Sequence, residues 1–142
     1  MKVKIKKLHQ VAQLPIKGTP GSAAYDLHSI ETVYIPPGET VTVRTGLAME
    51  IPDGWKGDVY SRSGLAMDGV VVANSPGKID CDYRGEVVVL LHNQRPSDVA
   101  CIEVGDRIAQ FEINPVHDIE FEVIDELSTT DRGEGGFGST GA

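Results

Sequence analysis

The sequence predicts an all-β fold, a jelly-roll sandwich or small barrel, with one short helix. Apolar and polar residues alternate with a period of two in several short segments, as they do in half-buried strands. Turns that contain proline, glycine or both separate these segments. Only one segment of the 142 residues favours a helix, so we expect a single β domain.

Four segments are expected to form strands. Residues 2–6 and 40–45 alternate polar and apolar side chains, and residues 119–123 do so again near the end of the chain. Residues 86–91 form a nearly continuous apolar run, which predicts a strand buried on both faces. Turn signals fall between the strands, at residues 36–38, 52–54, 75–77 and 95–98.

A helix of one or two turns is expected at residues 63–67, because Ser63 stands where an N-cap residue would. The composition then changes near Ser128, where the packed part of the chain is expected to end. We therefore divide the sequence into a β domain at residues 1–127 and a flexible, glycine-rich C-terminal segment at residues 128–142.

Charge and composition limit the classes of partner. A net charge of −8, from 21 acidic and 13 basic residues, disfavours duplex DNA or RNA, although a single nucleotide needs only a few local arginines and amides. No apolar run approaches the roughly 20 residues that span a bilayer, and the basic start lacks the apolar stretch of a secretory signal. Two cysteines, Cys81 and Cys101, are too few for a disulfide framework or a zinc site. We expect a cytoplasmic protein that binds neither nucleic acid nor membrane.

The last eleven residues, 132–142, combine five glycines with one arginine, one aromatic ring and two hydroxyls. An arginine binds phosphate in a bidentate manner, and a phenylalanine ring offers a face on which a base can stack. Arg132 and Phe137 therefore predict a mobile lid over a ligand that carries a base and phosphates. A plain disordered tail is the alternative, because glycine-rich segments commonly act as linkers.

Two further stretches carry groups suited to chemistry. Residues 62–64 place an arginine, a hydroxyl and a glycine at a predicted helix start, which suits an anion. Taken alone, an ordinary N-cap with a surface arginine is the favoured explanation of this stretch. Residues 77–86 are predicted to be hairpin-like, with Asp80 and Asp82 on one face and Cys81 opposite. A carboxylate there could hold a water for attack, while the alternative is an acidic surface hairpin. The carboxylate next to Cys81 raises rather than lowers its thiol pKa, so we do not expect a nucleophile there.

Together with two weaker motifs, these stretches resemble the trimeric deoxyuridine triphosphatases (dUTPases). The five motifs of that family stand in order across nearly the whole chain, and the third and fifth are highly specific. They are Ala-Ala-Tyr-Asp-Leu (23–27), Arg-Ser-Gly-Leu-Ala (62–66), Gly-x-Ile-Asp-x-Asp-Tyr-Arg-Gly (77–85), Gly-Asp-Arg-Ile-Ala-Gln (105–110) and Arg-Gly-x-Gly-Gly-Phe-Gly-Ser-Thr-Gly (132–141).

The resemblance implies hydrolysis of dUTP to dUMP and pyrophosphate by a jelly-roll homotrimer with composite active sites. It implies that Asp80 activates the water that attacks the α-phosphorus, and that Tyr83 packs on the deoxyribose and excludes a 2′-hydroxyl. Asp26 would support the pocket or the water shell of Mg²⁺, which the substrate's phosphates would hold without direct protein ligands. The other implied contacts are Gly77, Lys78, Ile79, Asn74 and Val88 toward the nucleoside, Arg62, Ser63, Gly64 and Gln110 toward the phosphates, and Arg132, Phe137, Gly138 and Ser139 from the lid.

The chain departs from the family pattern at few places. Ser61 stands where the family usually has proline, Cys81 where it has serine or alanine, and Val88 where many members have lysine; Lys78 replaces a small or apolar residue. None of these changes removes a residue that the implied chemistry needs. The resemblance also implies a cellular role in limiting uracil incorporation into DNA and in supplying dUMP for dTMP synthesis.

Two alternatives stay open at this stage. The dCTP deaminases share the implied fold, but they tend to carry a second serine after Arg-Ser and a bulky aromatic residue before Glu-Gly; Gly64 and Tyr83 favour the dUTPase side. A nucleotide-binding regulatory or interaction module that kept the pocket is the second alternative. The presence of Asp80 argues against loss of catalysis in such a module.

Overall fold

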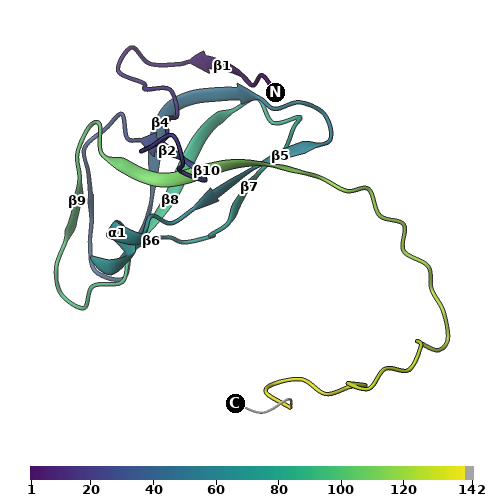
Figure 1. Ribbon diagram of the computed structural model, residues 1–142. Coiled ribbons are helices and arrows are strands. Elements are labelled where there is room, and N and C mark those ends of the chain that lie inside the picture. Colours follow the sequence, from purple (N-terminus) through teal and green to yellow (C-terminus); the bar gives the residue numbers. More distant parts are fainter. Residues whose placement is uncertain (140–142) are drawn as a thin grey trace.

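The computed structural model describes residues 1–139, and in this part of the chain it forms an all-β jelly roll with one short helix (Figure 1). One four-stranded antiparallel sheet has the order β1-β4-β8-β6, a second has the order β2-β10-β5-β7, and β3 pairs with β9. The elements are β1 (Lys4–Lys7), β2 (Tyr25–His28), β3 (Val33–Ile35), β4 (Thr40–Glu50), β5 (Trp55–Tyr60), α1 (Ser63–Met67), β6 (Val70–Val72), β7 (Gly77–Ile79), β8 (Glu86–Asn93), β9 (Ala100–Ile102) and β10 (Arg107–Pro115).

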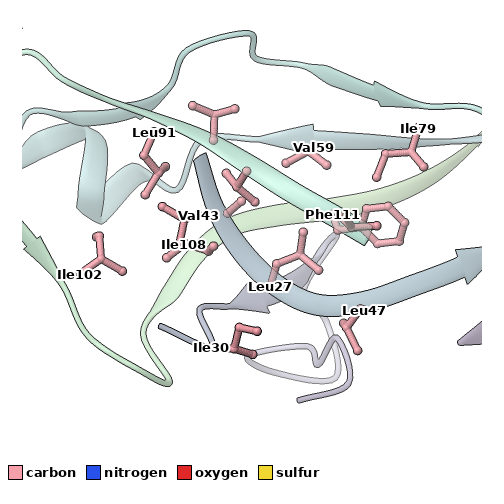
Figure 2. Packing of buried hydrophobic residues seen from close by; sticks show 14 of the residues in the cluster. Leu27, Ile30, Val43, Leu47, Val59, Ile79, Leu91, Ile102, Ile108 and Phe111 are labelled. Atoms are coloured by element: carbon pink, nitrogen blue, oxygen red, sulfur yellow. The ribbon is translucent and has the colours of Figure 1, made fainter. Parts of the chain in front are cut away.

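The core lies between the two large sheets and is filled by the inward side chain of every second strand residue (Figure 2). Leu27, Leu47 and Ile108 are fully buried there. Phe111 packs so closely over β5 that a Cβ on Gly57 would lie 2.5 Å from its ring, so glycine is required opposite this side chain. No helix in residues 1–139 is long and apolar enough to cross a membrane.

Three predicted strands form but differ from the prediction, the first being β1, which spans Lys4–Lys7 and not residues 2–6. The apolar run at 86–91 is not buried on both faces: in β8 the side chains alternate, with Val87 and Val89 buried and Val88 exposed. An apolar residue therefore lies on the outer face of this sheet. A continuous apolar run in the sequence does not by itself show that both faces of a strand are buried. β4 is longer than the predicted 40–45, because an irregularity between Arg44 and Ala48 interrupts the period of two and the strand then continues.

The predicted strand at residues 119–123 is absent, and β10 ends at Pro115. Ile119, Phe121 and Val123 are exposed, because the segment extends away from the β body instead of packing on it (Figure 1). The helix lies where it was predicted, at 63–67, but its N-cap is Arg62 and not Ser63, with no side-chain capping bond.

The stretch 77–85 is also not a paired hairpin. Its first part, β7, pairs with β5 in one sheet, while β8 pairs with β4 and β6 in the other. Residues 80–83 form a turn, closed by the Tyr83 amide donating to the Asp80 carbonyl at 3.2 Å, so Asp80 and Asp82 do not alternate on an extended strand. The segment connects the two sheets.

Asp58 fastens this connecting segment to the second sheet. It is 1% exposed on β5 and accepts hydrogen bonds from Lys56, from Lys78 on β7, and from Asn114 on β10 at 2.7 Å. Burial by itself would raise the pKa of Asp58, but the hydrogen bonds from Lys56, Lys78 and Asn114 outweigh burial and lower the pKa to about 2.

We expect Asp58→Asn to lower the free energy of unfolding at pH 7 by about 2 kcal/mol. Because the folded pKa lies below the ordinary value of 3.8, this stabilisation is present above that value and is lost as the pH falls toward 2. Urea unfolding should be measured between pH 7 and pH 2. In the acid range, the free energy of unfolding should change less with pH for Asp58→Asn than for the native chain. The exposed Asp125→Asn serves as the control, and equal slopes for Asp58→Asn and the native chain would contradict this account.

Candidate active site

A buried carboxylate organises the first cluster of predicted site residues. Asp26 on β2 is 5% exposed, and its Oδ1 accepts a hydrogen bond from Arg62 Nε at 2.9 Å. Its Oδ2 accepts from Arg107 Nη1 at 3.4 Å. Gln110 of β10 lies opposite Asp26 in the register. Arg107 was not among the predicted site residues, although it lies in the motif at residues 105–110.

His28 adjoins this cluster on the same strand. It is 5% exposed, and its Nδ1 has no hydrogen-bond partner among the described residues. Burial lowers the pKa of His28, Asp26 opposes that shift, and Arg107 and Arg62 add to it. Burial and the charges of the two arginines thus favour the neutral form of this imidazole. The four histidines of the sequence have no ligand-like spacing, so nothing in the sequence alone marks His28 as part of this cluster.

Ser63 and Gly64 begin α1 directly after Arg62, and both are exposed. The Arg62 carbonyl accepts a hydrogen bond from the Ala66 amide at 2.9 Å, which fixes the backbone at the start of the helix. The N-cap residue Arg62 makes no side-chain capping hydrogen bond, so its guanidinium is not used to close the helix. The structure therefore brings Asp26, Arg62 and Gln110 together, with Ser63 and Gly64 next to them.

Asp80 belongs to a different part of the surface. It is exposed at the end of β7 and lines a hollow of about 500 Å³ together with Asp53, Trp55 and Lys56. Lys78 and Cys81 line the same hollow. The carboxylate is thus neither covered by apolar side chains nor turned away from a cavity.

The backbone around β7 is presented in the same region. β7 is the last strand of its sheet, so one edge of Gly77–Ile79 is unpaired within the described chain. The side chain of Ile79 is buried, whereas Asn74 is exposed and lies against Gly77, where a Cβ would be 3.1 Å from the asparagine Nδ2.

Cys81 does not have the surroundings of an activated thiol. Its Sγ donates to Asp53 Oδ1 at 3.6 Å. Burial, followed by the hydrogen bond and the charge of Asp53, raises the pKa of Cys81. A raised pKa disfavours the thiolate, so the described geometry gives this cysteine no nucleophilic role.

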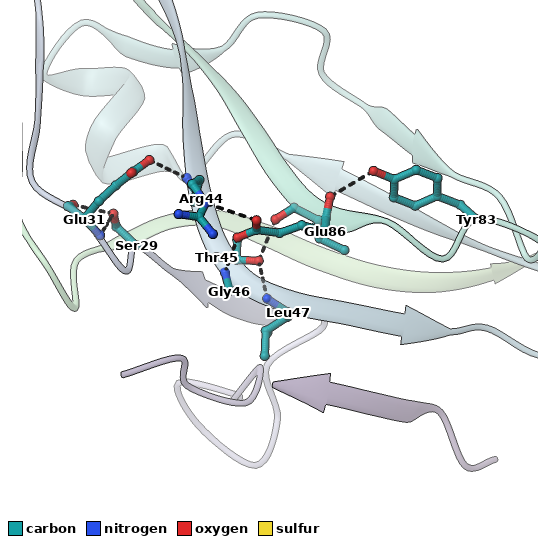
Figure 3. A network of polar contacts seen from close by, with 9 residues as sticks. Ser29, Glu31, Arg44, Thr45, Gly46, Leu47, Tyr83 and Glu86 are labelled. Carbon is teal, nitrogen blue, oxygen red and sulfur yellow. Dashed lines mark hydrogen bonds and ion pairs between the residues drawn. The ribbon is translucent and has the colours of Figure 1, made fainter. Parts of the chain in front are cut away.

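Tyr83 leaves the turn with its ring partly exposed, at 45%. Its hydroxyl donates to the Glu86 carbonyl at 3.0 Å (Figure 3). Val88, which follows Glu86 by two residues on β8, is 42% exposed. Both side chains are therefore accessible on the surface.

The strand register separates the Arg62 cluster from Asp80. Ile79 pairs with Gly57, and continuing that register by one residue places Asp80 beside Lys56. Arg62 follows Lys56 by six residues. At the rise of a β-strand this places Arg62 about 20 Å from Asp80. This span exceeds the length of a triphosphate chain, so one copy of the chain does not bring these groups to a common ligand.

The described part of the tail lies away from both regions (Figure 1). Arg132 Nε donates to the Gly135 carbonyl at 2.7 Å, and Phe137 is fully exposed with a φ of 50°. Gly138 and Ser139 follow as exposed residues. Thr140, Gly141 and Ala142 of the predicted lid lie outside the described residues.

Within residues 1–139, no group of three or more His, Cys, Asp or Glu side chains is arranged to hold a metal ion. Mg²⁺ is often bound through one or two carboxylates, several waters and substrate phosphates. Asp26 fits an indirect role of this kind, because each oxygen accepts one hydrogen bond from an arginine and keeps a lone pair for a metal-bound water.

A family model described as dUTPase matches residues 2–141. The chain is 51% identical to the deoxyuridine 5'-triphosphate nucleotidohydrolase of Nautilia profundicola, over 99% of both chains. It is 49% identical to the protein of the same name from a Hydrogenobaculum species, again over 99% of both. The corresponding Helicobacter pylori protein is 46% identical, over 99% of this chain and 97% of the relative.

Solved structures show the same likeness. A variant of the Staphylococcus bacteriophage 80alpha dUTPase, solved with dUpNHpp, has a TM-score of 0.88 and 30% identity, over 99% of each chain. A variant of the dUTPase from phage phi11 of S. aureus has a TM-score of 0.81 and 26% identity, over 89% of this chain and 99% of that one. Its description refers to coordination of a structural Mg(II) ion.

Proposed function

Because this chain belongs to the dUTPase family, we propose that it hydrolyses dUTP to dUMP and pyrophosphate, with Asp80 directing a water at the α-phosphorus. The observation that carries this proposal is the exposed Asp80 carboxylate at a hollow of about 500 Å³, beside the free edge of β7. Pyrophosphate release from dUTP, compared with dTTP, UTP and dCTP with and without Mg²⁺, tests it. Release of ammonia from dCTP would instead favour a deaminase.

In this proposal Asp80 accepts a proton from the water while the water oxygen bonds to the α-phosphorus. The bond from that phosphorus to the bridging oxygen breaks, and pyrophosphate leaves with the electron pair. Arg62 stabilises charge on the phosphates: its guanidinium has five N–H donors, of which Asp26 and the Arg107 carbonyl take two. Mg²⁺ would supply further charge neutralisation to the triphosphate, with Asp26 placed to hold its water shell.

We propose that the backbone of β7 recognises the uracil base. Its unpaired edge offers N–H and C=O groups that can pair with the edge of uracil as another strand or base would. A thymine methyl would meet this backbone sterically. Cytosine would present mismatched donors and acceptors, at about 1–3 kcal/mol for each unsatisfied group.

A cytoplasmic location and the role in keeping uracil out of DNA stay predictions.

We further propose a homotrimer in which each site combines groups from different subunits. The separation of about 20 Å between Asp80 and Arg62 along one chain supports this, because the two must serve one triphosphate. Closed cyclic association brings one end of a subunit to the other end of its neighbour. The exposed alternating side chains Ile119, Phe121 and Val123 also favour contact with another copy.

The C-terminal segment is proposed to be the lid of such a site. It extends away from its own β body (Figure 1), which supports contact with the site of a neighbouring subunit. Phe137, fully exposed, would stack on uracil, and Arg132 with Gly138 and Ser139 would bind the phosphates.

Asp80→Asn should reduce pyrophosphate release by a factor of about 10³, because amide nitrogen and oxygen do not accept the proton of the attacking water. Binding of dUTP, measured by calorimetry, should stay within a few-fold of the native value, since the change is isosteric. The neighbouring exposed Asp82→Asn is the matched control and should keep its activity. Native-like turnover by Asp80→Asn would remove the proposed base.

Deletion of residues 132–142 should lower kcat/KM for dUTP by about 10²-fold or more, because a lid contributes positioning and water exclusion. Light scattering should still find a trimer, since residues 132–139 of this segment take no part in the core. Turnover equal to that of the full chain would refute the lid.

Mixing two inactive variants tests the composite site. In trimers reassembled from equal amounts of Asp80→Asn and Arg62→Gln chains, about one quarter of the sites should combine an intact Asp80 with an intact Arg62 from another subunit. Pyrophosphate release should then recover to about that fraction of the native rate. No recovery in mixed trimers, verified by mass spectrometry, would mean that each site is built within one chain.

A further inference from the structure

We propose that Gly85 and Glu86 are positioning residues that set the sugar specificity of the site by holding the ring of Tyr83 in one place. This inference rests on the proposed function, since it concerns the discrimination between dUTP and UTP. Neither Gly85 nor Glu86 was among the predicted site residues. Figure 3 shows the contacts on which the argument depends.

Gly85 provides the space in which the ring lies. A Cβ at this position would be 2.3 Å from Tyr83 Oη, 2.5 Å from Cζ and 2.9 Å from Cε2, so the phenol packs directly on the glycine backbone. The φ of Gly85 lies outside the left-handed region, so an alanine could adopt this backbone. Glycine is therefore needed here for space and not for conformation.

Glu86 holds the same, hydroxyl-bearing end of the ring. Its backbone carbonyl accepts the Tyr83 hydroxyl at 3.0 Å. Its side chain is bound on both oxygens, since Oε1 accepts from the Gly46 amide at 2.8 Å and Oε2 accepts from Arg44 Nε at 3.0 Å. The acceptor for Tyr83 is thus tied to β4 and does not move independently.

The part of β4 that Glu86 grips is itself tightly packed. Gly46 has a φ of 67°, and a Cβ there would lie 2.9 Å from the Ala12 Cβ. The Arg44 amide donates to Glu31 Oε1 at 2.9 Å, and Thr45 Oγ1 donates to the Val87 carbonyl at 2.6 Å (Figure 3). The core of the sheet is therefore connected to Tyr83 by a short series of hydrogen bonds.

A fixed ring is what rejection of a 2′-hydroxyl requires. A steric barrier discriminates only if the blocking group cannot retreat, and each bond that holds Tyr83 raises the cost of retreat. With its hydroxyl end packed against Gly85 and its hydroxyl bound to Glu86, the ring has little freedom to make room for an added oxygen. Loss of either support should admit UTP more than it harms dUTP.

The test compares kcat/KM for dUTP and for UTP in four variants. Gly85→Ala should lower the ratio of kcat/KM for dUTP to kcat/KM for UTP by about tenfold or more, mainly through a higher kcat/KM for UTP, while kcat/KM for dUTP changes less. Gly21→Ala is the matched control, because a Cβ there meets nothing within 4 Å. Glu86→Ala should lower the ratio by about 3- to 10-fold, and Glu86→Gln, which keeps an acceptor for the Gly46 amide, should restore part of it.

A merely structural effect gives a different outcome. Reduced folding would lower both kcat/KM values in step and leave their ratio unchanged, and that result would overturn the inference. Thermal melting of each variant identifies loss of folded protein.

A readout without turnover separates this inference from the proposed function. In protein with ¹³C-labelled tyrosine, the ring signals of Tyr83, assigned with Tyr83→Phe, should shift in Gly85→Ala and stay in place in Gly21→Ala. Unshifted signals in Gly85→Ala would overturn the inference whatever the activity. A native chain that does not hydrolyse dUTP would instead remove the proposed function, while the ring signals would still report whether Gly85 positions Tyr83.

Discussion

The register of β5 between β10 and β7 is the constraint on which the rest of the structure depends. It places Arg62 at one end of a strand and Asp80 beside the other. Asp58, in the middle of β5, fixes both neighbours through Lys78 and Asn114, so the register cannot slip without exposing a buried carboxylate. The division of the site between the two ends follows from this pairing.

Much of the fold was predictable because it depends on local pattern. Alternation predicted the start of β4, and the short helix at 63–67 was placed correctly. The errors came where tertiary contacts decide the outcome. Residues 119–123 have the period of a strand, yet they have no sheet edge beside them in this chain, and periodicity does not show whether a partner strand is present.

For the candidate site, the residues were predictable from the sequence, but the contacts between them were not. The five motifs gave the residue types and their order, and the structure places Asp26, Arg62 and Gln110 together as one group. What the sequence did not indicate is which groups meet. Arg107 and His28 join the cluster through pairing between β2 and β10, and Glu86 reaches Gly46 across 40 residues of chain. Contacts of this kind depend on strand register, which single-sequence patterns do not specify.

The end of β10 at Pro115 has a consequence for how a lid of this kind would work. The sixteen residues from 116 to 131 separate the sheet from Arg132, and when fully extended they span at most about 55 Å. A closing segment that is covalently attached acts at a fixed effective concentration, which the length of its tether sets and dilution of the protein does not change. Once the subunits have assembled, closure over bound nucleotide would therefore be a first-order event, and shortening or lengthening the tether would tune its frequency without altering any contact in the pocket.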